Sequence, residues 1–441
     1  MINEISQDFK LIKLIKFTIP SIIMLIFMAL YSIVDGVFIS RFINTDALSS
    51  FNIIYPFINT VIGLGLMLSS GGSAVIAKKL GERKEEEARS NFSFIIIVGF
   101  IIGIIISFLG YVFSNKIITL LGATKPLFVY CKSYFLVTLI FVPFYILNLL
   151  YQMLSITAGK PKMGLVLTVV GGISNIILDY VFIVCLGYKI AGAALATGIG
   201  NFIPVLIGTL FFIKRNKMLY FDKAKVDLQV LKEACQNGLS EMVINLSTGV
   251  TTMFFNFKLM KYLGSDGVAA MSIVLYGQFL ITSIYIGFSS GVAPIISYNY
   301  GEQNKKQIKK IIKCSVIFMI AISIISYVIS MLIASNIVEI FTPKGSKVYY
   351  IGYRGFIIFG TSFLITGINI FISSMFTAFS NGKVSTIISF LRTFVFLTGA
   401  IFILPEIFNT VGIWISVPIA EILTIIVSIM YMCKYRSIYG Y

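Results

Sequence analysis

The sequence has no histidine, few cysteines and few charged residues, and each shortage excludes a class of function. Without histidine, a chain of 441 residues can build no imidazole proton relay, no histidine-ligated metal site and no serine–histidine triad. The five cysteines are scattered and contain no C-x-x-C pair, so they predict neither a disulfide framework nor a metal site. Walker A, nucleophile-elbow and potassium-filter motifs are also missing. We therefore expect no enzymatic activity and no cofactor.

Hydrophobic residues fill the chain instead. They make up 58% of it against 12% charged residues, and the mean hydropathy is +0.95. Apolar runs of about 20 residues recur, and each is long enough to cross a bilayer as a helix. The first, residues 14–40, is too long for a signal-peptide core. The sequence predicts an all-α polytopic membrane protein with twelve transmembrane helices. The predicted spans are 14–40, 50–77, 92–114, 127–157, 163–186, 190–213, 234–260, 268–297, 311–335, 351–379, 384–404 and 411–433.

The basic residues behind the net charge of +17 predict the orientation of these spans rather than a nucleic-acid partner. Of the 35 Lys and Arg residues, 24 fall on one side of this topology, nine on the other, and Lys258 and Arg392 inside spans. Basic residues concentrate in the cytoplasmic loops of membrane proteins. The distribution predicts a multi-pass protein of the cell (inner) membrane with both termini in the cytoplasm. Nothing indicates an oligomer, so we expect a monomer in the lipid bilayer.

The chain divides into two halves that resemble each other at a spacing of 220 residues. At this spacing, Ser69-Ser70-Gly71 matches Ser289-Ser290-Gly291, Gly81-Glu82 matches Gly301-Glu302, and Gly192 matches Gly412. The predicted organisation is an N-lobe (1–213), a cytoplasmic linker (214–233) and a C-lobe (234–441). Six spans per half make a parallel repeat, which is typical of transporters with a substrate site between or within the halves. Duplication also occurs in channels and membrane enzymes.

Four of the 18 acidic residues lie well inside predicted spans: Asp35, Asp179, Glu241 and Glu421. Acids in hydrocarbon are costly unless they are protonated, paired or in contact with water. Asn175 and Asp179 are four residues apart and share one helix face, so we expect the amide to donate to the carboxylate or to water beside it. Asp35 is the natural third member of their cluster. Such a cluster can exchange a proton, or its oxygens can hold Na⁺. The alternative is polar contact between helices with no role in transport.

The first span also contains a predicted hinge. Pro20 removes a backbone hydrogen bond, and Gly36 follows the acid at position 35. We expect bending near Pro20 to move this acid, although a static kink would give the same pattern.

The second half differs chemically from the first. At the repeat spacing, Asp35 corresponds to Phe255 and Asp179 to Gly399, so ion coupling is expected in the first half only. In the second half we predict a structural charge network in which Arg392 pairs with Glu421 or Glu241. The alternative is a direct role of these residues in transport.

The sequence resembles the multidrug and toxic compound extrusion (MATE) family, bacterial type, over essentially the whole chain. The resemblance rests on the twelve spans in two halves and on several motifs. These are VDGVFISRF (34–42), SSGGSAVIAKKLGE (69–82) with its echo SSGVAPIISYNYGE (289–302), NIILDYVFI (175–183) and GIWISVPIAE (412–421). It implies a V-shaped fold of two six-helix lobes that alternates between outward-open and inward-open states. It also implies export of varied, often cationic, small molecules in exchange for H⁺ or Na⁺.

The resemblance also implies a coupling site in the N-lobe. Asp35, Asn175 and Asp179 match its acidic and amide positions, and Tyr134 and Thr197 match its tyrosine and threonine by spacing. Pro20 matches a proline whose bending belongs to the proposed cycle. Other branches carry an acid in the middle of span 7, whereas this chain has only Glu241 near the start of that span.

The predicted function is therefore cation-coupled antiport of cationic or amphiphilic compounds, with H⁺ and Na⁺ both open as the coupling ion. One alternative is a flippase for a lipid-linked precursor, which would need a cationic cavity for pyrophosphate. Another is an ion channel, which the asymmetric halves do not suit.

Overall fold

The computed structural model describes residues 5–43, 45–215 and 218–441, and of residues 32, 33, 36, 37, 39–41, 45 and 48 it describes only the backbone. The described chain is almost entirely helical, as predicted. The first half contains α1 (Leu11–Phe42), α2 (Thr45–Gly81), α3 (Glu85–Val112), α4 (Ser114–Leu120), α5 (Lys125–Thr157), α6 (Pro161–Asp179), the π-helix η1 (Tyr180–Cys185) and α7 (Lys189–Ile213). The second contains α8 (Leu228–Gly301), α9 (Lys305–Phe341), α10 (Lys347–Gly360), α11 (Phe363–Ala378), α12 (Gly382–Phe390), the π-helix η2 (Leu391–Phe396) and α13 (Leu397–Tyr439).

These helices accommodate the twelve predicted spans. Within the described residues, nine helical segments are long and apolar enough to cross a membrane, and α10 with α11 forms a tenth, bent by 51°. Two of the nine, Leu228–Gly301 and Gly382–Tyr439, are long enough for two spans each. Each is interrupted by one residue of positive φ, Gly264 (66°) in the first and Asn409 (51°) in the second. Counting both as helical pairs gives twelve spans.

Several helices begin earlier than the sequence indicated, and two of them show the reason. α3 starts at Glu85 rather than near residue 92, and its first turn holds three glutamates, which favour a helix N-terminus. α8 starts at Leu228, six residues before the predicted span at 234, because the Asp227 side chain accepts hydrogen bonds from the backbone N–H groups of Gln229 and Val230. Polar residues at the N-terminus thus extend both helices beyond their apolar segments.

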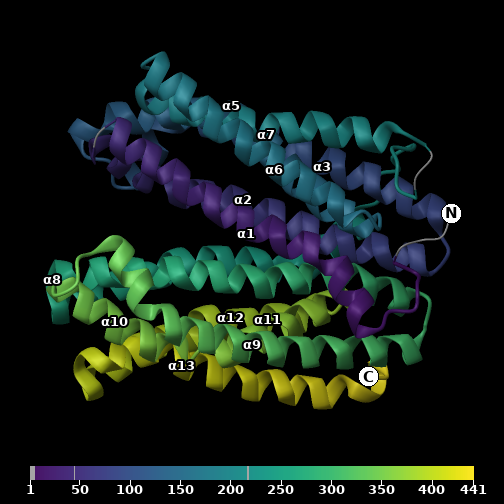
Figure 1. Cartoon of the computed structure of the whole chain (residues 1–441). Helices are drawn as coiled ribbons and strands as arrows, with labels where there is room; N and C mark the ends of the chain where they lie inside the picture. Colours follow the sequence, from purple (N-terminus) through teal and green to yellow (C-terminus); the bar gives the residue numbers. More distant parts are fainter. Residues whose placement is uncertain (1–4, 44, 216–217) are drawn as a thin grey trace.

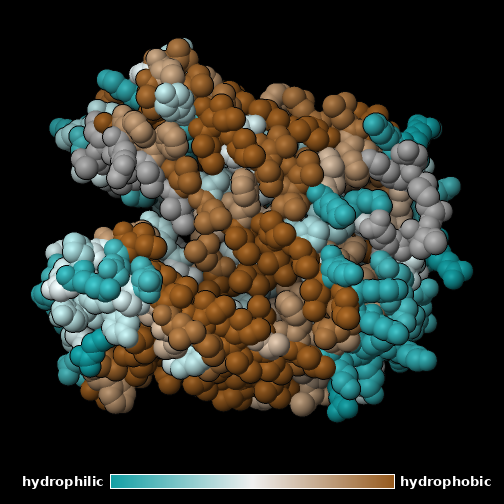
Figure 2. Space-filling model, viewed as in Figure 1, coloured by the Kyte–Doolittle hydropathy of each residue, from teal (hydrophilic) through white to brown (hydrophobic). Residues whose placement is uncertain are grey.

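The helices form two bundles that lie side by side (Figure 1). The N-lobe holds α1 to α7 and the C-lobe holds α8 to α13, with both chain termini at the same end of the molecule. Figure 2 shows a broad hydrophobic band across the middle and hydrophilic residues at the termini end. At the opposite end, the surface is hollowed by a cleft between the two bundles. This belt is the surface expected of a protein surrounded by lipid.

The two lobes touch near the termini end through glycines that match in the repeat. A Cβ on Gly81 would collide with the carbonyl oxygen of Tyr298, and one on Gly301 with that of Lys78. Deeper in the seam, a Cβ on Gly238 of α8 would collide with the Met67 carbonyl of α2. Small residues let helix backbones approach this closely. The reciprocal contacts join the lobes at the termini end, and the cleft in Figure 2 opens at the other end.

Candidate functional site

The N-lobe brings two acids together. The carboxyl groups of Asp35 on α1 and Asp179 at the end of α6 lie close enough to act on each other. Asp179 is completely buried. Neither of its oxygens, nor Oδ1 of Asp35, has a hydrogen-bond partner among the described residues. Both acids lie in the half of their helices away from the termini end, rather than at mid-depth. A buried acid pair without a counter-ion is a place where a small cation would be strongly favoured.

Asn175 lies one turn from Asp179 on α6, as predicted, but its amide has a different partner. We expected the amide to donate to the carboxylate or to water beside it. Instead, Nδ2 of Asn175 donates to Oγ1 of Thr197 on α7 at 3.3 Å. Oγ1 of Thr197 itself donates to the Ala193 carbonyl at 2.9 Å, so its lone pairs are available as acceptors. α7 packs against this face of α6 and offers the nearer acceptor.

Tyr134 also belongs to this cluster. Its side chain is buried, and the charges of both Asp35 and Asp179 act on its phenol. The sequence missed three further tyrosines that lie within electrostatic range of Asp35: Tyr31, Tyr55 and Tyr145. They come from α1, α2 and α5, so no spacing along the chain connects them.

The predicted hinge positions have different outcomes. Pro20 is buried, and α1 runs through it as one helix from Leu11 to Phe42. The segment around it faces the C-lobe, because a Cβ on Gly287 of α8 would lie 2.6 Å from Cα of Ile22. Gly36 lies among the positions described by backbone only, so its surroundings are outside the described residues. Bending at Pro20 stays a prediction.

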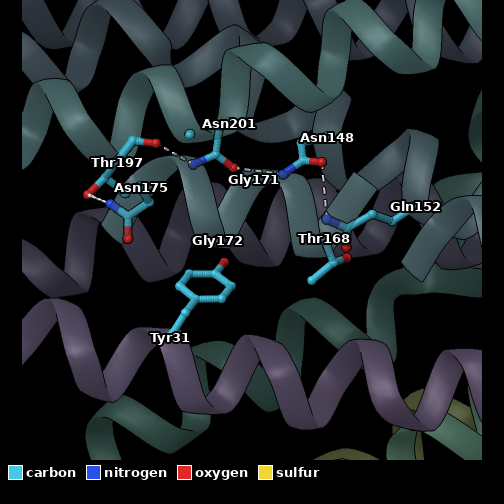
Figure 3. Close-up of a pocket in the computed structure, with 10 residues that line it drawn as sticks. Tyr31, Asn148, Gln152, Thr168, Gly171, Gly172, Asn175, Thr197 and Asn201 are labelled. Carbon is cyan, nitrogen blue, oxygen red and sulfur yellow. Dashed lines mark hydrogen bonds between the residues drawn. The ribbon is translucent and has the colours of Figure 1, made fainter. Parts of the chain in front are cut away.

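A polar pocket lies between α1, α5, α6 and α7, and Figure 3 shows the residues that line it. The pocket is small, with space for about one water molecule. Its amides form a chain: Asn201 donates to the Thr197 carbonyl (2.8 Å), Asn148 to Asn201 (2.9 Å) and Gln152 to Asn148 (3.1 Å). No sequence prediction pointed to this pocket. A signal was present, because Asn148 and Gln152 on α5 have the same four-residue spacing as Asn175 and Asp179. The lining residues are Tyr31, Asn148, Gln152, Thr168, Gly171, Gly172, Asn175, Thr197, Gly200 and Asn201.

The C-lobe acid Glu421 is neutralised. Nη2 of Arg392, on η2, lies 2.8 Å from Oε1 of Glu421, and Nε donates to the same oxygen at 2.9 Å. Asn369 of α11 donates to the other oxygen at 2.7 Å. The structure therefore pairs Arg392 with Glu421, one of its two predicted partners.

Glu241 does not join this network, which corrects the predicted three-residue cluster. Among the described residues it forms no ion pair, and besides the bonds of the helix itself its backbone carbonyl accepts a hydrogen bond from the Asn245 side chain. Glu241 lies on the part of α8 that packs against α2, whereas Arg392 and Glu421 meet between η2 and α13.

The second intramembrane cation, Lys258, is also neutralised. Its Nζ lies 2.7 Å from Glu406, although the lysine side chain is only 6% exposed. The flexible stem of the lysine carries the ammonium to Glu406, whose side chain is 53% exposed.

Comparison with known proteins identifies the scaffold. The MatE family model matches residues 20–181 and again residues 241–401, once in each lobe. A "Multidrug export protein MepA" of Staphylococcus saprophyticus is 26% identical over 412 residues, covering 92% of this chain and 90% of that protein. Its namesake from Staphylococcus aureus is 25% identical over 426 residues, covering 96% and 94%.

Solved structures share the fold. A MATE transporter crystallised in complex with MaL6 superposes with a TM-score of 0.92 at 22% identity, covering 99% of this chain and 98% of that one. A multidrug resistance MATE transporter of the MOP superfamily in an outward-facing conformation gives 0.91 at 22% identity, covering 97% and 96%. Since the family model matches most of the chain in two consecutive copies, this protein belongs to the MatE family of membrane transporters.

Proposed function

We propose that this protein exports organic cations in exchange for H⁺ or Na⁺, and that Asp35 and Asp179 bind the coupling ion. The observation that carries the proposal is the buried acid pair, which has no counter-ion among the described residues. The MepA relatives are named as multidrug export proteins, which supports drugs as the substrates. With both termini in the cytoplasm, the cleft opposite them corresponds to an outward-open state.

The acid pair supplies a mechanism. Two ionised carboxylates in contact repel strongly in a poorly hydrated site, and one bound cation removes much of that repulsion. In the outward-open state, H⁺ or Na⁺ enters and draws α1 and α6 together at Asp35 and Asp179. This change in N-lobe packing favours release of the substrate. Return to the inward-open state passes the ion to the cytoplasm and restores the empty pair.

Both coupling ions suit the residues present. A proton shared between the carboxyl groups would form a strong charge-assisted hydrogen bond. Na⁺ would find carboxylate oxygens together with neutral oxygens on Asn175 and Thr197, which are hard ligands. Asn175, Thr197 and Tyr134 are therefore proposed to position the ion rather than to carry its charge.

Substitution of Asp35 tests the proposal. Asp35→Asn is expected to abolish efflux of ethidium from intact cells at unchanged expression, because a single acid no longer generates the repulsion that an ion relieves. Glu86→Gln makes the same chemical change at an exposed position on the termini end and should leave efflux intact. Normal efflux in Asp35→Asn would reject the proposal.

Proteoliposomes then separate the two ions. Ethidium transport driven by an imposed pH gradient but not by a Na⁺ gradient identifies H⁺, and the reverse result identifies Na⁺. Transport that follows neither gradient would overturn coupled antiport.

The flippase alternative has less support. It requires cations free to bind pyrophosphate, whereas the two cations inside the spans, Lys258 and Arg392, are each paired with an acid.

A further inference from the structure

One acid inside the membrane belongs neither to the acid pair nor to the Arg392–Glu421 ion pair. Glu241 is half-buried on α8, and among the described residues no basic side chain contacts it. A charge in this position needs a partner. The surroundings of Glu241 therefore show what that partner is.

Glu241 lies where the cleft begins. The α8 face containing Gly238, Met242 and Asn245 packs against α2, with Cβ of Asn245 and Cα of Met242 at 3.5 and 3.6 Å from a Cβ built on Gly63. One turn farther along the same face, a Cβ on Gly249 would have no atom within 4 Å. The two lobes therefore part between Asn245 and Gly249, and Glu241 lies one helical turn from Asn245 on the side of the termini end.

A polar stripe continues from Glu241 along the wall of the cleft. Residues 241, 245, 248 and 252 share one helix face, because spacings of four, three and four residues follow the helical repeat. Thr248 is exposed and Thr252 partly so. The exposed apolar residues of this helix lie on a different face, which is the one that meets lipid. They are Leu239, Leu246, Val250, Met253, Phe257 and Met260.

The stripe offers acceptors to the cleft. Thr248 donates its hydroxyl proton to the Ile244 carbonyl at 2.8 Å, and Thr252 to the Thr248 carbonyl at 2.8 Å. The Asn245 amide nitrogen donates to the Glu241 carbonyl at 2.9 Å. The helix backbone thus engages these donors, leaving oxygen lone pairs and one carboxylate for a ligand. A surface of acceptors around a negative charge selects a cation.

We propose that Glu241 binds the positive charge of the transported compound, with the Asn245, Thr248 and Thr252 oxygens above it. This inference rests on the proposed function and adds that substrate and coupling ion occupy separate lobes. The substrate cation binds to the C-lobe wall, and the coupling ion binds to Asp35 and Asp179. Coupling between them then passes through the arrangement of the lobes, not through competition for one carboxylate.

Binding of ethidium to the purified full-length protein tests the assignment. Ethidium keeps its charge at all pH values, so fluorescence polarisation at fixed pH and Na⁺ concentration reports binding without titration of the ligand. Glu241→Gln is expected to weaken ethidium binding about tenfold, a typical effect of losing one partly buried charge partner. It should leave binding of uncharged phenanthridine unchanged. Glu241→Asp should retain most of the affinity, and Glu86→Gln all of it.

The outcomes separate this inference from the proposed function. Equal ethidium affinity in wild type and Glu241→Gln would overturn the role of Glu241 and leave the acid pair untouched. Equal weakening of ethidium and phenanthridine would show a structural role and also overturn it. Should Glu241→Gln fail to fold, Thr248→Val on the same stripe should weaken ethidium alone, and an unchanged affinity would reject the stripe. Absence of ethidium binding and transport in the wild type would reject both proposals.

Discussion

The two lobes use equivalent positions in opposite ways. Gly172 and Asn201 line the N-lobe pocket, and 220 residues later the chain has Arg392 and Glu421, which form the buried ion pair. The hydrogen bond from Asn148 to Asn201 also has a counterpart, one residue out of register, in the bond from Asn369 to Glu421. In the C-lobe, the Arg392–Glu421 ion pair thus occupies the positions that line a pocket in the N-lobe.

This difference shows how a duplicated scaffold can specialise. The N-lobe places its two acids, Asp35 and Asp179, at positions where the C-lobe has Phe255 and Gly399. It therefore combines two adjacent acids, which have no counter-ion among the described residues, with a small polar pocket, whereas the C-lobe pairs its buried acid Glu421 with Arg392.

The largest expected effect comes from breaking the C-lobe pair. Arg392→Leu would leave Glu421, only 5% exposed, buried without its cation, which costs about 3–5 kcal/mol. We expect a large loss of thermal stability in detergent. Arg392→Met combined with Glu421→Gln removes both charges and should recover much of that loss. An Arg392→Leu variant as stable as the wild type would show that the ion pair does not stabilise the fold.

The next effect comes from filling the N-lobe pocket. A Cβ on Gly172 would lie 2.6 Å from Cε1 of Phe27 and 2.8 Å from Cδ1 of Tyr31, so Gly172→Ala should displace α1 at a cost of about 1–3 kcal/mol. We expect ethidium efflux to fall while the protein stays folded. The matched control is Gly399→Ala in the C-lobe, where a Cβ meets nothing within 4 Å. Equal efflux in Gly172→Ala and Gly399→Ala would show that the pocket has no role in transport.

The smallest effect concerns an exposed ion pair that joins the lobes. Lys310 of α9 donates to Asp8, before α1, at 2.7 Å, and this hydrogen bond lowers the pKa of Asp8. A lowered pKa in the folded state means that the pair stabilises the fold above the pKa of the unfolded chain. That contribution is lost as the pH falls through the folded value.

Asp8→Asn should consequently lower the melting temperature slightly at neutral pH and not at all in strong acid, since exposed pairs contribute little. A melting-temperature loss comparable to that of Arg392→Leu would remove the distinction between buried and exposed pairs.

Much of the site followed from the sequence, because a charge in hydrocarbon is conspicuous and the four-residue spacing fixes a shared helix face. Asp35, Asn175 and Asp179 were identified in this way, and the structure places them in one cluster. Partner choice could not be predicted equally well. The Asn175 amide donates to Thr197, and Arg392 pairs with Glu421 rather than with Glu241, because each contact depends on how the neighbouring helices are rotated. The amide pocket and the surrounding tyrosines come from several helices and leave no local pattern.

The sequence alone determined that this chain lies in a membrane, that its helices form two related halves, and which acids lie among apolar residues. Each of these depends on composition and spacing along the chain, through the cost of exposing polar groups to lipid. Tertiary structure decided which acids are neutralised, which lobe keeps a cavity and where the lobes part. Those features depend on contacts between helices far apart in sequence, where a single glycine or arginine determines whether a space is open or filled.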